Sequence, residues 1–373
     1  MVSVDAFLLA VPEREQRDLR DRLAHVRWPD EVEAAGWDYG VPLEVLRDVA
    51  EDWRRFDWGA YQEYLNDLPN VLADFGDATM HAVVPSAEED AIPLVLLHGW
   101  PSSYLEYLAV AEILTADAVR PRLRPILVSL PGYGFSRVPL RRGYSYEAAA
   151  AQLLELLSAL GIERFSAHAH DHGAAIVGRA IASAPHRLIA YHTTEPGIPG
   201  IDVPDDEVTD ELRAFRALAD EWEAADGGYE RIQSTRPQTL AYGLTDSPIG
   251  LAAWILDKWH AWGGENGLDG LDPDLVLGTL SLWWFTRTAG PAARAYFEGR
   301  VASRPLSREH RFDIPLGVTL TDQDIERVPR AIVERRWSNI KLWRDLGRGG
   351  HFLAARDPFD LAGSLVELHA ALG

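Results

Sequence analysis

Cysteine is absent from the 373 residues, which excludes disulfide bonds, thiolate zinc sites and a cysteine nucleophile. Positive charge is scarce, because 36 Lys and Arg residues face 57 Asp and Glu residues and the formal net charge is −21. A field of this sign repels nucleic acid and anionic membranes, so we expect neither as a partner. No stretch of about 18 apolar residues occurs. The short apolar run near the N-terminus has no basic residues before it, so we expect no transmembrane helix, no signal peptide and a cytoplasmic location.

The rest of the composition is ordinary for a globular protein. Hydrophobic residues make up 47% of the chain and charged residues 25%, and no internal repeat or low-complexity tract stands out. From residue 92 onward, short apolar runs alternate with helical patterns, and three of these runs cover residues 92–99, 124–136 and 186–196. Such alternation predicts a mostly parallel sheet with right-handed crossovers and helices on both faces. A ligand site is then expected at the carboxyl ends of the strands.

The pattern divides the chain into three parts. Residues 1–85 are rich in aromatic residues at helical spacing, and we interpret them as a mainly helical arm that clamps onto the domain that follows. Residues 86–200 and 307–373 carry the alternating pattern and form the predicted α/β core. Residues 201–306 contain helical segments with Trp and Gly, and this insertion between strands predicts a cap over the site.

The candidate chemistry begins in the stretch from Arg164 to Ser183. A short apolar run ends there in a histidine-flanked turn, with Asp171 at its tip and the small residues Ala169 and Gly173 two positions to either side. A sharp strand-to-helix turn needs small residues at this spacing because the backbone packs closely. The spacing resembles the nucleophile elbow of α/β-hydrolases, with Asp in place of Ser. A carboxylate suits attack on saturated carbon that bears a leaving group, and the product is an alkyl ester that water hydrolyses.

Two other interpretations of this turn stay open. An Asp between a strand and a helix is often only an N-cap. His168, His170, Asp171 and His172 also resemble a metal cluster, because His and Asp are common zinc ligands. The run HAHDH is one residue shorter than the HxHxDH run of binuclear metallo-hydrolases, and the missing residue turns the later side chains to the other face of the strand. We therefore expect no metal and no cofactor.

Three residues follow the order of a hydrolase triad. Asp171, Asp324 and His351 each come after a predicted strand, in the chain order nucleophile, acid, base. His351 would take a proton from the water that attacks the ester, while Asp324 holds its other nitrogen. Asp322 and Glu326 lie within the same turn as Asp324, so the residues alone leave three candidates for the acid.

The loop HGWP at residues 98–101 follows the first of the apolar runs. Ester hydrolysis requires backbone N–H groups aimed at the developing oxyanion, and we expect those of Trp100 and His172 to form this oxyanion hole. Backbone donors place no demand on the side chain, which allows a histidine at position 172. We interpret the side chain of His98 as support for the loop.

With these residues in place, the chain resembles the microsomal-type epoxide hydrolases, an α/β-hydrolase family with an N-terminal helical arm, over almost its whole length. The matching stretches are RWPD at 27–30, GWDYG at 36–40, LNDLP at 65–69, HGWPSS at 98–103, PGYGFS at 131–136 and GGHF at 349–352. This combination is more specific than any single turn. The resemblance implies that Asp171 opens an epoxide by trans attack and that the ester intermediate is hydrolysed to a vicinal diol.

The resemblance also implies roles that the pattern alone does not assign. Two cap tyrosines of the family protonate the epoxide oxygen, and Tyr229 and Tyr296 match them. A neutral phenol suits this task because it donates a proton without competing as a nucleophile. The stretch IPLGVTLTDQDI, matched from its Ile-Pro pair onward, places the family's acid on Asp324. Some members carry a membrane anchor before the arm, and we expect none here.

The chain departs from the family beside the nucleophile. Members usually have Gly-Gly before the nucleophile and Trp after it, whereas Ala169, His170 and His172 occupy these positions here. Positive charge on either histidine would lower the pKa of Asp171, and we expect the bulk and charge of these side chains to narrow the site or to demand a polar substrate. A dehalogenase of the same fold remains an alternative, although the missing Trp weakens it. A protein of this fold that binds without turnover is a second alternative.

The expected partner is a small-molecule epoxide. The cap is rich in aromatic residues, which indicates a pocket for an apolar or aromatic substrate, but the same side chains are equally suited to packing at a hinge. These residues are Trp254, Trp259, Trp262, Trp283, Trp284 and Phe285. Formation of a homodimer is left open.

Overall fold

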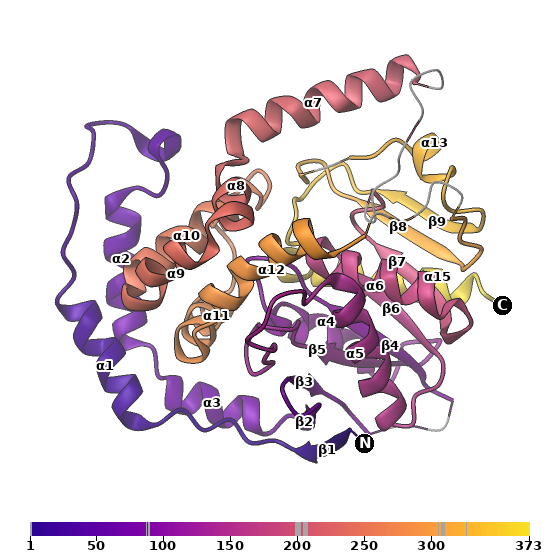
Figure 1. Ribbon diagram of the computed structural model, residues 1–373, viewed down its shortest axis with the longest axis horizontal. Helices are drawn as coiled ribbons and strands as arrows, with labels where there is room; N and C mark the ends of the chain where they lie inside the picture. The colour runs from indigo at the N-terminus through magenta and orange to yellow at the C-terminus, as the bar shows by residue number, and fades with distance from the viewer. Residues whose placement is uncertain are drawn as a thin grey trace.

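The computed structural model describes residues 2–86, 88, 90–197, 203, 208–304, 306, 310–325 and 327–373. Within these residues nine strands form one sheet in the order β1-β2-β3-β5-β4-β6-β7-β8-β9 (Figure 1). From β5 to β9 all neighbouring strands are parallel, whereas β1, β2 and β3 pair antiparallel with their neighbours. The strands are β1 Ser3–Ala6, β2 Asn70–Asp74, β3 Thr79–Val83, β4 Ile92–Leu97, β5 Leu123–Val128, β6 Phe165–Ala169, β7 Leu188–Thr193, β8 Leu316–Leu320 and β9 Ile340–Asp345.

Helices cover both faces of the parallel part of the sheet, because its central strands bury side chains on both faces. In β4, Val95 and Leu97 pack in one apolar cluster, and Leu94 and Leu96 pack in a second cluster across the sheet. Helices α5 and α6 contribute to the first cluster, and α4 and α15 contribute to the second. The bounds of these helices are α4 Leu108–Thr115, α5 Tyr146–Ala159, α6 Asp171–Ser183 and α15 Pro358–Ala370. The arrangement confirms the predicted α/β-hydrolase fold.

Residues 2–85 contain the helices of the arm that the sequence predicts and, in addition, strands that it does not predict. They contain the helices α1 Glu13–Ala24, α2 Leu43–Arg55 and α3 Trp58–Asn66, but also β1, β2 and β3. Strand β3 pairs with β5 of the core through Ala82 and Val83, so this part of the segment belongs to the sheet. Short antiparallel strands gain their stability from distant partners and leave only a weak local pattern in the sequence.

Between β7 and β8 the chain forms the helices of the expected cap. They are α7 Asp210–Asp226, α8 Gly228–Thr235, α9 Pro237–Asp246, α10 Pro248–Ala261, α11 Pro273–Thr286 and α12 Ala289–Ala302. The boundaries expected at residues 200 and 307 lie outside the described residues, and the division of the chain at these points stays a prediction. The short helices α13 Arg330–Val333 and α14 Leu353–Arg356 and the 3₁₀ helices Gly36–Tyr39, Tyr104–Tyr107 and Pro185–Arg187 are further elements.

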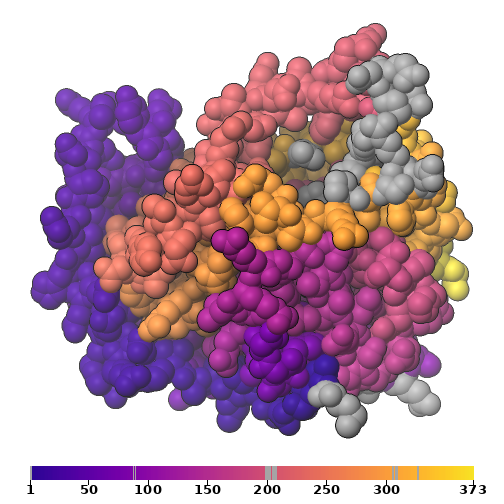
Figure 2. All heavy atoms as spheres, in the orientation of Figure 1, coloured from indigo at the N-terminus to yellow at the C-terminus, as the bar shows by residue number. Residues whose placement is uncertain are grey.

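The helices of the N-terminal segment lie along the cap helices. Figure 2 shows the indigo N-terminal helices beside the salmon and orange helices of the cap, and α1 and α2 contact α10 while α3 contacts α11. The indole Nε1 of Trp53 donates to Oγ of Ser281 in α11 at 2.8 Å. The ring of Trp37 stacks on His260 of α10, with 3.5 Å between the ring centroids. The arm therefore clamps the cap as well as joining the sheet.

Among the residues that the structure describes, none of the helices combines the length and the apolar character that a membrane crossing requires.

Candidate active site

Asp171 lies at the turn between β6 and α6, near the middle of the sheet. Its φ is +48°, in the left-handed region that residues with a Cβ rarely adopt. The turn depends on Gly173, because a Cβ at that position would lie 2.6 Å from the carbonyl oxygen of Leu97 in β4. Backbone strain held in this way is typical of a nucleophile elbow. The N-cap position of α6 is occupied by His170, so Asp171 is the first residue of the helix and not its N-cap.

The Oδ1 atom of Asp171 accepts two backbone hydrogen bonds. The N–H of Trp100 donates at 2.8 Å and the N–H of His172 donates at 2.5 Å, and these are the two donors that the sequence predicts. The loop that carries Trp100 can lie this close to Asp171 only because residue 99 is glycine. A Cβ at that position would lie 2.5 Å from Cβ of Asp171. Burial alone would raise the pKa of Asp171, but the imidazoles of His172 and His351 and the two backbone donors lower it below its ordinary value. The carboxylate is therefore anionic and oriented by its surroundings.

His351 and Asp324 form a buried pair. Nδ1 of His351 lies 2.9 Å from Oδ1 of Asp324, and the two side chains are 0% and 1% exposed. Because a carboxylate only accepts hydrogen bonds, the proton stands on Nδ1, and Nε2 is the basic nitrogen. No described residue forms a hydrogen bond with this Nε2. Asp322 instead binds Arg327 at 2.7 Å on the surface, and Glu326 lies outside the described residues.

Tyr229 of α8 and Tyr296 of α12 extend from the cap toward the elbow. The ring of Tyr229 stacks on that of Trp100, with centroids 4.7 Å apart and 8° between the ring planes. The ring of Tyr296 packs edge to face against the ring of His172, with 4.4 Å between the ring centroids. Burial, together with the nearby charge of Asp171, raises the pKa of both phenols well above the ordinary value. Both side chains therefore keep their protons.

The three histidines of the HAHDH run turn in different directions. Nδ1 of His168 lies 2.9 Å from Nδ1 of His192 in β7, while Nδ1 of His172 lies 2.8 Å from the hydroxyl of Tyr146. Burial lowers the pKa of both His168 and His172, which favours their neutral forms. His170 instead lies against Glu106, with its Nε2 2.8 Å from Oε1 of that residue. The metal cluster that the spacing resembles is therefore not assembled by this run.

Two buried acids beside the predicted triad were not singled out from the sequence. Oε1 of Glu106 lies 2.8 Å from Nε2 of His170. Glu195 accepts a hydrogen bond from the backbone N–H of Asp171, and its Oε1 lies 3.8 Å from Nδ1 of His351. The sequence carries a signal for Glu195, because it lies at the carboxyl end of the apolar run 186–196 and so at the same edge of the sheet as the other site residues.

His170, Glu195 and His351 have ligand atoms within 4.8 Å of one another, and in the described part of the chain this is the one group that could hold a metal ion. A cation there would compete with bonds that are already made. His351 is bonded to Asp324, and Glu195 is bonded to the backbone N–H of Asp171. We therefore assign no metal to the group.

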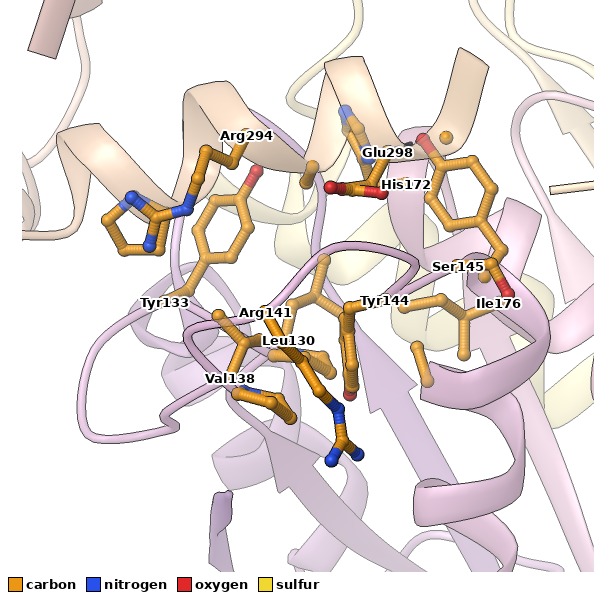
Figure 3. Close-up of a pocket in the computed structure, with 17 residues that line it drawn as sticks. Leu130, Tyr133, Val138, Arg141, Tyr144, Ser145, His172, Ile176, Arg294 and Glu298 are labelled. Carbon is orange, nitrogen blue, oxygen red and sulfur yellow. Dashed lines mark hydrogen bonds between the residues drawn. The ribbon is translucent and has the colours of Figure 1, made fainter. Parts of the chain in front are cut away.

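A pocket opens beside the elbow, between the loop that follows β5 and helix α12 (Figure 3). Its empty volume is about 570 Å³, counting space that is open to solvent. Leu130 and Ile176 contribute apolar wall, and Arg294 and Glu298 of α12 lie on the cap side. His172 also lines the pocket, so the pocket reaches the residue next to Asp171.

Two of the cap tryptophans bind the loop beside the elbow, and a third packs against the site. The indole of Trp259 donates to the carbonyl oxygen of Pro101 at 3.2 Å, and that of Trp283 donates to the carbonyl oxygen of Ser102 at 3.0 Å. These two residues anchor the cap on the HGWP loop. Trp262 instead packs against His351 with 5.4 Å between the ring centroids, so it belongs to the site.

Known proteins resemble the chain over almost its full length. Residues 4–107 match the family described as Epoxide hydrolase N terminus, and residues 92–233 match the one described as alpha/beta hydrolase fold. A protein of Stigmatella aurantiaca named "Putative epoxide hydrolase" is 33% identical over 98% of this chain and 84% of its own length. Epoxide hydrolase 1 of Sus scrofa is 27% identical over 96% of this chain and 87% of its own.

Solved structures agree with these relatives. The epoxide hydrolase of Aspergillus niger superposes with a TM-score of 0.86 at 25% identity, covering 100% of this chain and 97% of its own. The juvenile hormone epoxide hydrolase of the silkworm Bombyx mori has the same fold, with a TM-score of 0.85 at 24% identity and coverage of 100% and 94%. Of the functions left open by the sequence, these relatives support epoxide hydrolysis. The chain belongs to the epoxide hydrolase family, of the microsomal type, and it is an enzyme that hydrolyses epoxides.

Proposed function

We propose that Asp171 opens the epoxide by attack of Oδ2 on a ring carbon. The observation that carries the proposal is that both backbone donors, from Trp100 and His172, go to Oδ1. The attack forms an ester bond between Oδ2 and the carbon and breaks the carbon–oxygen bond of the ring. Oδ1 then becomes the ester carbonyl oxygen. It already lies in the oxyanion hole that stabilises its negative charge when water adds to the ester.

The oxygen released from the ring takes a proton from the pair formed by Tyr229 and Tyr296. The raised pKa of each phenol supports this role, because both are protonated while the epoxide binds. Their rings pack against Trp100 and His172, the two residues whose N–H groups hold Asp171. The phenols that protonate the alkoxide therefore pack directly against the residues that orient the attacking carboxylate.

Hydrolysis of the ester returns the enzyme to its starting state. Nε2 of His351 takes a proton from the water whose oxygen attacks the ester carbon, and Asp324 stabilises the imidazolium. The acyl–oxygen bond then breaks and the proton on His351 passes to the diol oxygen. The second proton of the water restores the phenol, while the water oxygen stays in the carboxylate of Asp171.

An apolar or aromatic epoxide is the substrate that we propose. Support comes from the apolar wall that Leu130 and Ile176 contribute to the pocket beside the elbow and from the aromatic rings of Tyr229 and Trp262. The cytoplasmic location stays a prediction from the sequence, and formation of a homodimer stays open.

The test is a single turnover with styrene oxide in oxygen-18 water, followed by mass analysis of the diol and of the peptide that contains Asp171. The ester route places oxygen-18 in this peptide and leaves the first diol with oxygen-16. A first diol that carries the solvent label would remove Asp171 as the nucleophile and leave direct attack of water. Asp171→Asn is the matched control, since its amide forms no ester and the peptide should stay unlabelled.

A further inference from the structure

Glu195 is a buried carboxylate that contacts both halves of the proposed machinery. It follows β7, and its side chain is 5% exposed. One carboxylate oxygen, Oε2, accepts the backbone N–H of Asp171. The other, Oε1, lies 3.8 Å from Nδ1 of His351, the nitrogen that also faces Asp324. Glu195 therefore links the turn of the nucleophile to the ring of the base.

The buried side chain of His170 lies behind Glu195. Nε2 of His170 lies 2.8 Å from Oε1 of Glu106, and its Nδ1 lies 4.0 Å from Oε2 of Glu195. That Nδ1 has no hydrogen-bond partner among the described residues. Burial alone would lower the pKa of His170, but the charge and the hydrogen bond of Glu106 raise it above the ordinary value. His170 thus places a group that can carry positive charge between the two carboxylates, with Nε2 facing Glu106 and Nδ1 facing Glu195.

We propose that Glu195 is a positioning residue which, together with Asp324, stabilises the imidazolium of His351 while the ester on Asp171 is hydrolysed. The inference rests on the function proposed above. Ester formation neutralises Asp171, so the nucleophile no longer contributes negative charge when His351 takes up its proton. Glu195 and Asp324 keep their charges at this stage, and attraction over 3.8 Å is strong in a site that excludes water.

Among the described groups around His351, Glu195 and Asp324 are the two carboxylates that can stabilise its imidazolium during ester hydrolysis. The charged or titratable groups that face it are Asp324 after β8, Glu195 after β7, and His170 and Asp171 in the elbow. From the cap, Trp262 packs on the ring and carries no charge. Glu106 forms its hydrogen bond with His170 and not with His351. Only Glu195 and Asp324, among these described groups, present negative charge to His351 once the ester has formed.

The test is Glu195→Gln, because the amide oxygen can still accept the N–H of Asp171 but the charge is gone. Rapid quenching and mass analysis with styrene oxide follow ester formation and ester hydrolysis separately across pH. Hydrolysis needs neutral His351, so its rate rises with pH along an acidic limb. Without the charge of Glu195 the imidazolium is less stable, and we expect this limb to move to lower pH. Ester formation should change little.

Two control variants separate charge from structure. Glu195→Asp restores the carboxylate, and we expect the acidic limb to return toward its wild-type position even if the shorter side chain weakens the bond to the backbone of Asp171. Glu155→Gln changes an exposed residue on α5 and should leave both steps and the limb unchanged.

The deciding experiment repeats Glu195→Gln in an Asp324→Asn background. If the charge of Glu195 acts on His351 itself, Glu195→Gln lowers the hydrolysis rate and moves the limb to lower pH in this background also, where Asp324 no longer contributes charge. A limb that moves in neither background overturns the inference while ester still forms on Asp171. Absence of any ester in the wild type would instead overturn the function proposed above, and with it the inference.

Discussion

Gly99→Ala is the substitution that tests the geometry of the elbow most directly. The added methyl carbon would lie 2.5 Å from Cβ of Asp171 and 2.8 Å from its Oδ1. Carbon atoms normally approach no closer than about 3.5 Å, so the carboxylate or the loop must move by about 1 Å. The bond from the N–H of Trp100 to Oδ1 is 2.8 Å long, and a shift of that size takes it beyond hydrogen-bonding distance.

The expected cost follows from these distances. Loss of one oxyanion donor lowers kcat by about 10²- to 10³-fold, and the overpacking reduces the free energy of unfolding by about 1–3 kcal/mol. Diol formation from styrene oxide and thermal melting measure the two effects. Gly243→Ala is the control, because Gly243 lies in α9 with nothing within 4 Å of an added Cβ, and it should stabilise the helix by about 0.5–1 kcal/mol. A folded Gly99→Ala enzyme with activity within about threefold of wild type would refute the reasoning.

Three further substitutions probe other parts of the molecule. Tyr296→Phe should slow ester formation by about 10²-fold and leave ester hydrolysis unchanged, as rapid-quench mass analysis would reveal. Burial alone would raise the pKa of Glu106, but its partner His170 lowers it, and the pKa of His170 is raised in turn. The stabilisation from Glu106 is lost as pH falls through its lowered pKa, and that from His170 is lost as pH rises through its raised pKa. Glu106→Gln should therefore lower the melting temperature near neutral pH and reduce the fall in melting temperature that accompanies loss of the His170 proton as pH rises above about 6.5; an unchanged fall would contradict the pairing. Trp53→Phe removes a buried 2.8 Å bond to Ser281 and should cost about 1–3 kcal/mol in unfolding experiments, whereas adding Ser281→Ala should cost little more.

Periodicity in the sequence was sufficient to predict the parallel sheet but not its N-terminal edge. The apolar runs that became β4, β5 and β7 are bounded by turn residues and alternate with helices, so local pattern and tertiary structure agree. Strands β1 to β3 are short and pair with each other and with β5. Their stability comes from partners that are distant in the chain, and the helical pattern of α1 to α3 dominates the same segment.

The site illustrates the same limit at the level of single residues. Asp171 and His351 are recognisable because each follows a strand in a turn of small residues. The acid is not, since Asp322 and Asp324 lie within one turn, and only the bond from Asp324 to His351 separates them. Glu195 has no motif of its own, and its importance depends on how the end of β7 is placed against the elbow. Distances across neighbouring strands are tertiary information that one sequence does not carry.

The proposed oxyanion hole and the proposed proton donors are parts of one packed unit, because the donors of the hole are backbone N–H groups. Trp100 and His172 hold Asp171 through their N–H groups, so their side chains are available for other contacts. Trp100 uses its ring to stack on Tyr229, and His172 packs against Tyr296. A displacement of the cap that separated these rings would therefore also disturb the donors at the nucleophile.

The N-terminal arm extends this coupling to the far side of the cap. Trp53 of the arm binds Ser281 in α11, and two residues further along the same helix the indole of Trp283 binds the carbonyl of Ser102 in the loop that follows Trp100. One helix thus joins the arm to the loop that supplies an oxyanion donor. A member of this family that kept the core but lost the arm would lose a restraint on the geometry of catalysis as well as buried surface, which is a physical reason for the arm and the core to occur together in one chain.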